Sequence, residues 1–262
     1  MRIAVTLSPT GDWNEILRAA QVADESGIDA VGFWDHYHSE QPEWSYVCGW
    51  SAYGALAQAT KRIHLLPMVI CRLNYTLGVL AKETSLISII SGGRFELGIG
   101  AGDYPIEYTA WHQPFPDAIT RIEALEESIE ALRMIWQGGA VNYSGKHVQL
   151  TEAACTPAPP APPRVVVGVG ASRRLLRRAV SYADELNLYT DPELIKEARQ
   201  LVADSGRSVE LSVFYHPPTW PDNLRDELAR WAELGVDRVA VNIGYDLNLP
   251  ERVAEVAEIK LD

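Results

Sequence analysis

Short apolar segments alternate with amphipathic ones along the whole chain, and this alternation restricts the fold more than any other feature of the sequence. In the first repeat, the apolar segment 3–7 precedes apolar side chains at helical spacing from Trp13 to Ala23, and Gly27 follows as a stop signal. Strands and helices that alternate in this way form a parallel α/β sheet. The expected strands are 3–7, 30–34, 63–69, 95–100, 165–168, 186–188, 210–214 and 239–243.

Eight strand–helix repeats in 262 residues fit one architecture well. A (β/α)8 barrel takes about 250 residues, and no linker divides the chain, so a single domain is expected over residues 1–262. Two irregular segments, 35–50 and 103–118, follow the second and fourth strands. We therefore predict an α/β fold, a single (β/α)8 TIM barrel with insertions after strands 2 and 4. An open doubly wound sheet is the alternative, because the strand count rests on pattern alone.

Charge and cysteine content exclude several classes of function. The formal net charge of -12 argues against a nucleic-acid or anionic-membrane surface, since both need clustered Lys and Arg. Cys48, Cys71 and Cys155 lack metal-ligand spacing, which indicates reduced thiols and no metal site. No apolar run is long enough for a membrane helix. We expect a cytoplasmic protein whose partner is a small molecule.

A glycine-rich strand end is the first candidate for a binding site. Gly98, Gly100 and Gly102 lie at the end of the strand 95–100 and just beyond it. Glycines are unfavourable in a strand unless a backbone or a ligand approaches closely. The carboxyl ends of barrel strands carry active sites, so a ligand is expected there. A β-bulge is the alternative.

Both irregular segments contain many ring side chains. Such density on loops suits a planar ring ligand. The alternative, favoured for any single ring, is that it packs the loop onto the barrel. The residues are His36, His38, Trp44, Tyr46 and Trp50 in the first segment, and Tyr104, Tyr108, Trp111, His112 and Phe115 in the second.

Two polar residues at strand ends, His36 and Asp103, are candidates for proton transfer. His36 follows the second strand, where an imidazole can exchange a proton with a ligand near neutral pH. The alternative is that Asp35 orients His36 within a packed loop. Asp103 follows the fourth strand and is either a general acid or base or the N-cap of the next helical turn.

A turn of small residues is a candidate phosphate site. Gly168, Val169, Gly170, Ala171 and Ser172 follow the fifth strand and open a helix, so their backbone N–H groups can face an anion. The helix carries Arg173, Arg174, Arg177 and Arg178, which fit either an anion site or a solvated helix face. The turn lacks the third glycine of a dinucleotide fingerprint and the Gly-Lys-Ser/Thr of a Walker loop.

Several motifs in a fixed order resemble the bacterial luciferase-like flavin and deazaflavin oxidoreductases, and the resemblance covers roughly residues 1–190. It is closest to the branch that uses coenzyme F420, a deazaflavin with a phosphate and an oligoglutamate tail. The matching segments are Asp35–His36, Arg62–Val69, Leu80–Lys82, Ser91–Arg94, Leu97–Gly102, Arg121 with Glu126, Ile135–Trp136, Gly145–His147, and Pro162–Pro163 followed by Gly168.

The resemblance implies a position for each part of the cofactor. Asp35 and His36 would face the ring, and a bulge with a non-proline cis peptide near Pro67–Met68 would bring Met68 and Ile70 under it. Ala101, Gly102 and Ile106 would pass along the ring and its ribityl chain. Gly168, Val169, Ala171 and Ser172 would hold the phosphate. Two residues depart from the family pattern: Ser88 stands where many relatives have aspartate, and Val169 where they have a second glycine.

Hydride transfer between F420 and a small organic substrate is the function that the resemblance implies, with His36 or Asp103 moving the accompanying proton. FMN in place of F420 would imply a monooxygenase. The second half is shorter than in most relatives, which raises the alternative of a non-catalytic F420-binding barrel. A phosphate-binding lyase or isomerase is less favoured, because lysines are scarce at the expected strand ends. Similar proteins are often homodimers, so a homodimer is expected.

Overall fold

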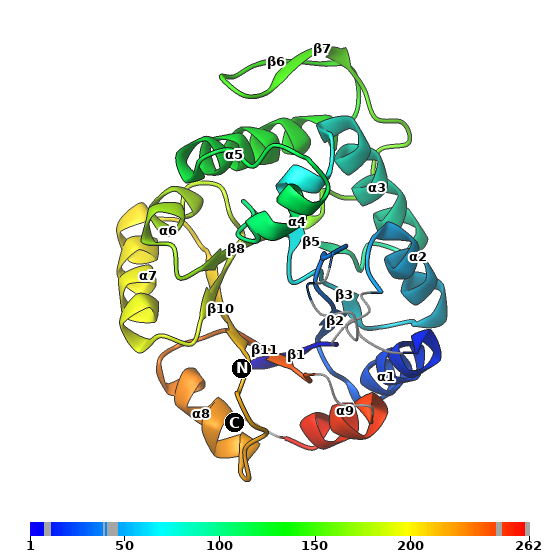
Figure 1. The fold of residues 1–262 in the computed structure, drawn as a ribbon, viewed down its shortest axis with the longest axis vertical. Coiled ribbons are helices and arrows are strands. Elements are labelled where there is room, and N and C mark those ends of the chain that lie inside the picture. The colour runs from blue at the N-terminus through cyan, green and yellow to red at the C-terminus, as the bar shows by residue number, and fades with distance from the viewer. Residues whose placement is uncertain (8–11, 39, 41–46, 245–247, 260–262) are drawn as a thin grey trace.

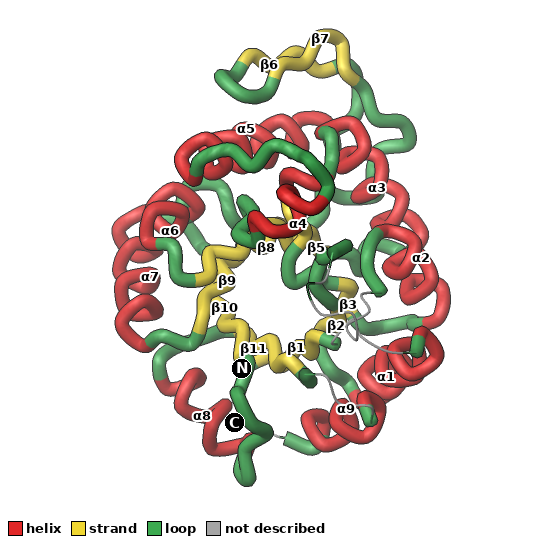
Figure 2. Tube along the Cα trace, in the orientation of Figure 1, coloured by secondary structure: helices red, strands yellow, loops and turns green. Residues whose placement is uncertain are grey.

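Nine parallel strands curl into a barrel in the computed structural model, which describes residues 1–7, 12–38, 40, 47–244 and 248–259. Figures 1 and 2 show the strands as a ring with the helices outside it. The order around the sheet is β3-β2-β1-β11-β10-β9-β8-β5-β4. The strands are β1 (Arg2–Thr6), β2 (Ala30–Gly32), β3 (His64–Leu65), β4 (Ile70–Cys71), β5 (Glu96–Gly100), β8 (Arg164–Gly170), β9 (Glu185–Tyr189), β10 (Glu210–Tyr215) and β11 (Arg238–Asn242).

Helices between successive strands form the outer layer of the barrel (Figure 1). Several of them begin or end at the usual capping residues. Asp117 accepts hydrogen bonds from Ile119 and Thr120 at the start of α5, and Gly27 ends α1 in the left-handed conformation, as predicted. The helices are α1 (Trp13–Ser26), α2 (Trp50–Ala59), α3 (Leu77–Ile90), α5 (Ala118–Ile135), α6 (Arg173–Ala179), α7 (Pro192–Ser205), α8 (Leu224–Glu233) and α9 (Leu249–Ala257).

The third barrel strand is split, and the split accounts for nine strands where the sequence predicted eight. β3 and β4 are its two parts, and residues 66–69 between them leave the regular pairing. A parallel bridge between Leu65 and Phe95 closes the ring, so the barrel prediction is confirmed and the open sheet is excluded. The Met68–Val69 peptide bond is cis, one residue beyond the expected dipeptide.

Glycines in the neighbouring strands make room for this split strand. A Cβ on Gly32 would lie 1.7 Å from the carbonyl oxygen of Leu66, and one on Gly98 would lie 1.8 Å from that of Pro67. A Cβ on Gly100 or Gly168 would come within 2.9 Å of the Val69 side chain. The glycine-rich strand is therefore closely approached, as expected, but the group that approaches it is the protein's own third strand and not a ligand.

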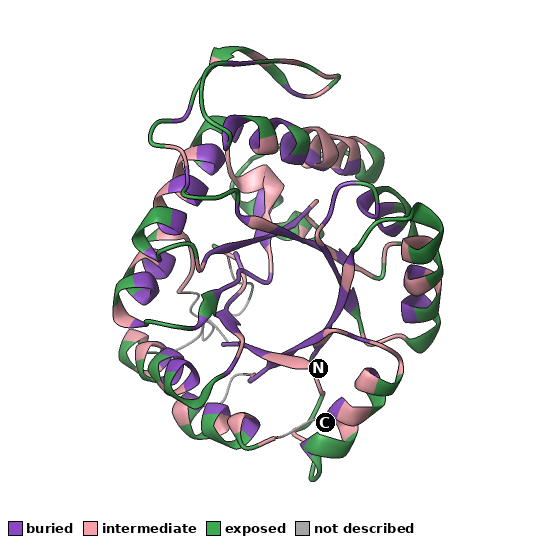
Figure 3. Cartoon of the chain, turned by 180° about the vertical axis from the view of Figure 1, so that it is seen from behind, coloured by how far each residue is buried: buried purple, intermediate pink, exposed green. Residues whose placement is uncertain are grey.

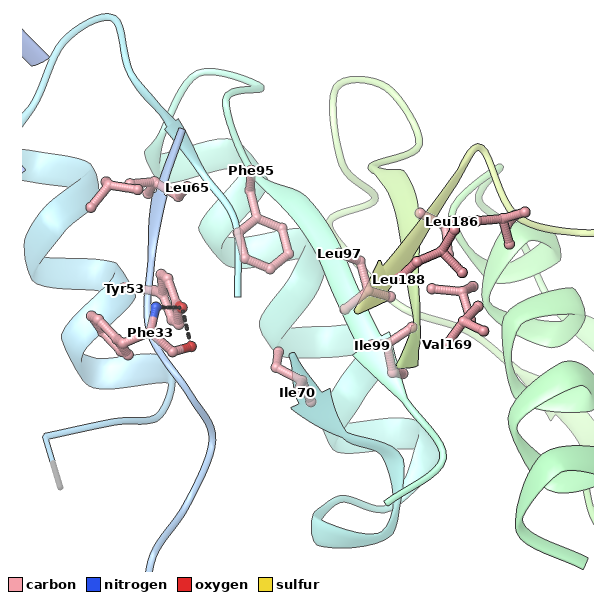
Figure 4. Packing of buried hydrophobic residues seen from close by; sticks show 14 of the residues in the cluster. Phe33, Tyr53, Leu65, Ile70, Phe95, Leu97, Ile99, Val169, Leu186 and Leu188 are labelled. Atoms are coloured by element: carbon pink, nitrogen blue, oxygen red, sulfur yellow. Dashed lines mark hydrogen bonds between the residues drawn. The ribbon is translucent and has the colours of Figure 1, made fainter. Parts of the chain in front are cut away.

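Two apolar layers hold the barrel together. Inside the ring, small side chains such as Ala4, Ala30 and Ala240 leave space that Leu66 and Met68 fill. The larger layer lies between the sheet and the helices, where the strands are buried and each helix buries one side (Figure 3). In Figure 4, Tyr53 of α2 packs against Phe33, 4.5 Å between ring centroids, and its hydroxyl bonds to the Phe33 backbone.

Charged residues close the amino end of the barrel. Arg238 is fully buried and donates two hydrogen bonds of 3.0 Å to the two carboxylate oxygens of Glu96. Most strands begin with a charged residue or a histidine, so their side chains meet at this end. The first residues concerned are Arg2, His64, Glu96, Arg164, Glu185, Glu210 and Arg238.

Two further elements lie outside the regular repeats. The short helix α4 (Pro105–Ala110) lies in the connection from β5 to α5. The antiparallel hairpin of β6 (Val141–Ser144) and β7 (Gln149–Ala153) extends beyond the helices in Figure 1. The described part of the chain has no helix that is both long and apolar enough to cross a membrane.

Candidate active site

A cavity of about 590 Å³ opens at the carboxyl ends of the barrel strands, and we call it the carboxyl-end cavity. Most of the residues predicted from the sequence line it together. Ile70 does not, because it is buried among the apolar side chains between sheet and helices, and Ile106 lies exposed on α4. The predicted residues that line the cavity are Asp35, His36, Met68, Ala101, Gly102, Asp103, Gly168, Val169, Gly170, Ala171 and Ser172.

His36 is oriented by a glutamate that the sequence did not single out. Its Nδ1 lies 3.2 Å from Oε1 of Glu107, a residue of α4 with only 2% of its surface exposed. The same oxygen accepts the backbone N–H groups of Tyr37, at 2.9 Å, and His38, at 3.2 Å. Glu107 therefore fixes both the imidazole and the loop that carries it, a role that the sequence alternative gave to Asp35.

Asp35 is buried beside the cavity and has its own set of donors. Its carboxylate accepts hydrogen bonds from the Tyr75 hydroxyl at 2.8 Å, the Asn74 amide at 3.1 Å and the Cys71 backbone at 3.1 Å. Burial raises the pKa of Asp35 to about 6, and these hydrogen bonds oppose the rise only in part. Asp35 therefore titrates close to neutral pH.

Asp103 lies exposed at the rim of the carboxyl-end cavity. It is not the N-cap of α4, because that position belongs to Tyr104 and carries no side-chain capping bond. The Tyr104 ring stands 5.1 Å from the His36 ring, edge to face. Asp103 therefore does not serve as a helix cap, and its carboxylate is available at the mouth of the cavity.

The turn Gly168–Ser172 borders the cavity, but the arginines after it do not. Arg173 and Arg177 both form ion pairs with Glu197, at 2.8 and 2.9 Å, and Arg178 pairs with Glu126 at 2.6 Å. These residues form a solvated helix face, one of the two alternatives that the sequence left open. Any anion at this turn meets the backbone and Ser172 instead.

Arg121 is the cation that reaches the cavity, and the sequence had named it only as part of a motif. Its guanidinium donates to the carbonyl oxygens of Gly102, at 3.2 Å, and Pro116, at 2.5 Å, and lies 4.1 Å from the centroid of the Phe115 ring. Among the described residues no carboxylate lies within ion-pair distance of it. Its charge is therefore directed to carbonyl oxygens and the cavity.

An aromatic wall lines another part of the cavity. It consists of Trp34 after β2, Phe214 in β10 and His216 after β10. The Trp34 ring lies 6.5 Å from Phe214 and 6.2 Å from His216, and the last two lie 6.0 Å apart. Burial lowers the pKa of His216. A strand-end search of the second half of the sequence would have found His216, which directly follows a strand.

The other ring residues divide between cavity and packing. Tyr104 and Tyr108 line the cavity with His36, whereas Trp50 packs against Tyr75 and Phe95. Trp111 is largely exposed. Trp44 and Tyr46 lie outside the described residues.

Two partly buried thiols lie near the cavity without being reactive. The Cys71 sulfur is 3.0 Å from the Tyr108 hydroxyl, and burial raises the pKa of this thiol to about 11. The Cys48 thiol donates to the backbone oxygen of His36, and burial raises its pKa to about 12. Both stay protonated at neutral pH. The described residues contain no cluster of metal ligands.

A parallel barrel with a ligand cavity at its carboxyl ends, an oriented histidine and a small-residue turn defines a class of α/β-barrel enzymes. The family model of luciferase-like monooxygenases matches residues 1–257. The chain belongs to this luciferase-like family, as its motifs had indicated.

Two curated relatives of the chain have the same name. The chain is 30% identical to an F420-dependent glucose-6-phosphate dehydrogenase of Gordonia bronchialis, over 95% of this chain and 78% of that protein. It is 27% identical to one of Amycolatopsis mediterranei, over 77% of this chain and 65% of the relative. The match thus spans about two thirds to four fifths of these relatives' length.

Solved structures share the fold. An F420-dependent secondary alcohol dehydrogenase, in complex with an F420-acetone adduct, superposes with a TM-score of 0.85 at 17% identity, covering 99% of this chain and 98% of that one. A coenzyme F420 dependent tetrahydromethanopterin reductase from Methanopyrus kandleri gives 0.81, also at 17% identity, covering 98% and 97%. At this identity the likeness concerns the fold.

Proposed function

We propose that this luciferase-like enzyme binds coenzyme F420 in the carboxyl-end cavity and transfers a hydride between it and a small organic substrate. The observation that carries the proposal is the convergence on one cavity of His36, the inward Met68 and the turn Gly168–Ser172, segments far apart in the sequence. Curated relatives named as F420-dependent dehydrogenases support the choice of cofactor.

The residues present fit such a cofactor. A volume of about 590 Å³ falls in the range of ligand sites, about 300–1,000 Å³. Met68, Ala101 and Gly102 offer an apolar and glycine surface to a flat ring, while Arg121 and Ser172 offer donors to a phosphate. We propose these residues, with Asp35 and the rest of the turn, as the cofactor contacts.

The proton accompanying the hydride is assigned to His36. F420, when bound, supplies a ring carbon that accepts or donates a hydride. The bond from Nδ1 to Glu107 makes Nε2 the basic nitrogen of the neutral ring, so a substrate hydroxyl exchanges its proton with Nε2. Asp103, at the rim, is the second proposed proton carrier.

A paired titration tests the cofactor. Purified protein is titrated with F420 and with FMN while cofactor fluorescence is followed, and we expect tighter binding of F420. Ala101→Trp, which fills the cavity, should abolish binding, whereas Ile119→Trp on the exposed side of α5 should leave it unchanged. Preference for FMN would favour a monooxygenase instead, and binding of neither would refute the proposal.

A further inference from the structure

The carboxyl-end cavity has two chemically different ends. Strands β5 and β8 are neighbours in the ring, and β1 and β11 lie opposite them. Arg121, Ser172 and Leu175 line the cavity beside β5 and β8. The aromatic wall comes from β2 and β10, the strands that flank β1 and β11. The arginine and the aromatic wall are thus on opposite sides of the ring.

Positive charge is confined to one of these ends. Arg121 is the cation among the described residues that line the cavity, and it bonds to Gly102 after β5, the strand next to the one that leads into the turn Gly168–Ser172. The undescribed residues add no Lys or Arg in the sequence apart from Lys260, near the end of the chain. The cofactor carries a phosphate of its own, and Arg121 beside this turn is the group suited to pair with it.

The remaining charges around the cavity are negative. The carboxyl groups of Asp35, Asp103 and Glu107 all line it. A phosphate group on a substrate would need charge-assisted donors in place of its water shell, and burying it beside carboxylates without such donors is costly. The aromatic wall, in contrast, offers apolar ring surface.

We propose, on the basis of the function proposed above, that the substrate is an uncharged apolar alcohol or the matching carbonyl compound, bound against Trp34, Phe214 and His216. Phosphorylated sugars, which the names of the curated relatives specify for those proteins, are excluded by the same arrangement.

The reaction balances with the groups already assigned. Bound F420 would supply the hydride acceptor for the carbinol carbon of the alcohol, while Nε2 of His36 would take the proton of its hydroxyl. The products are the carbonyl compound, the reduced cofactor and a protonated histidine, which returns its proton to solvent. Reduction of the carbonyl compound is the reverse.

A matched pair of ligands tests the substrate class. Benzyl alcohol and 4-(hydroxymethyl)phenyl phosphate share a ring and a reactive carbinol and differ in charge. Binding of each to the F420-loaded protein is measured by calorimetry, and turnover is followed by the loss of F420 absorbance. We expect the neutral alcohol to bind and react at least about tenfold better.

Two variants test whether the aromatic wall binds the alcohol. Phe214→Ala should weaken binding of benzyl alcohol about tenfold, whereas Trp111→Ala, an exposed ring outside the cavity lining, should not change it. Equal or better binding of the phosphate, or failure of the neutral alcohol to bind, would overturn the substrate assignment. F420 affinity is measured on the same samples, so loss of cofactor binding would be recognised separately as failure of the proposed function.

Discussion

The two ends of the barrel use charged residues in opposite ways. At the amino end, Arg238 and Glu96 are buried and paired in a bidentate geometry, with His64 only 2.8 Å from the same carboxylate. At the carboxyl end, Arg121 has carbonyl oxygens as its partners, and Asp35 has neutral donors. Charges at the amino end therefore stabilise the fold, while those at the carboxyl end surround a space for a ligand.

The pKa values express the same difference. Burial would raise the pKa of Glu96, but the hydrogen bond from His64 and the charge of Arg238 lower it to about 2. Burial of Asp35 is opposed only by neutral donors and by the adjacent His36, so its pKa rises to about 6. Two buried carboxyl groups in one barrel thus respond to burial in opposite directions, because only one has an arginine against it.

Breaking the amino-end network should produce the largest loss of stability. Glu96→Ala leaves Arg238 buried without its bidentate partner, which costs about 3–5 kcal/mol of unfolding free energy. Glu197→Ala, which removes the exposed pairs with Arg173 and Arg177, should cost less than about 1 kcal/mol. Urea unfolding of both variants measures these losses of unfolding free energy. Equal losses would mean that burial does not distinguish the two networks.

Removing the histidine at the carboxyl end should affect turnover and leave the fold intact. We expect His36→Ala to lower kcat about 10²–10⁴-fold with F420 affinity close to that of the wild type. His38→Ala is the matched control, since this neighbouring histidine does not line the cavity. Steady-state kinetics with a reactive alcohol gives the comparison, and unchanged kcat in His36→Ala would remove the residue from the mechanism.

The pH dependence of stability should differ in sign between the ends. The pKa of Asp35 is about 6 in the fold and 3.8 ordinarily, so its contribution is present at low pH and is lost as pH rises from about 4 to 6. The pKa of Glu96 is about 2 against 4.5, so its contribution is present above pH 4.5 and is lost as pH falls toward 2.

Urea unfolding across this range separates the two contributions. Asp35→Asn should remove a decline in unfolding free energy of about 3 kcal/mol between pH 4 and 6. Glu96→Gln should instead reduce the loss of stability as pH falls below 4.5. A decline between pH 4 and 6 that persists in Asp35→Asn would assign it to another group.

The smallest effect should come from the arginines of α6. Arg173→Ala is expected to change F420 affinity less than about twofold, because Glu197 already neutralises this side chain at the surface. Arg121→Ala is the contrasting variant and should weaken cofactor binding clearly more. Fluorescence titration compares them, and a stronger effect of Arg173 would place the anion site on the helix face.

The sequence was sufficient to predict the barrel and to identify cavity residues that directly follow strands. Alternating segments predicted the architecture, and strand-end positions identified His36 and Asp103, both of which line the cavity. The glycine pattern correctly indicated a close approach, yet no pattern reveals that residues 66–69 of the same sheet are what approaches.

Other residues of the site carry weaker signals. Glu107 lies on a six-residue helix inside a loop, where nothing in the sequence distinguishes a buried glutamate from an exposed one. The amino-end network did have a signal, a charged residue at the start of most strands, but pairing among them depends on barrel closure. Contacts between distant strands are the part that a linear pattern leaves open.

The split third strand also restricts which residues of the neighbouring strands can be substituted. Gly32, Gly98, Gly100 and Gly168 belong to three different strands, yet each avoids a clash with the same four residues, 66–69. A substitution at any one of these glycines meets the same obstacle, so the positions do not vary independently. In a library that diversifies the cavity, they are best kept constant as a single unit of selection, while the aromatic wall is randomised freely.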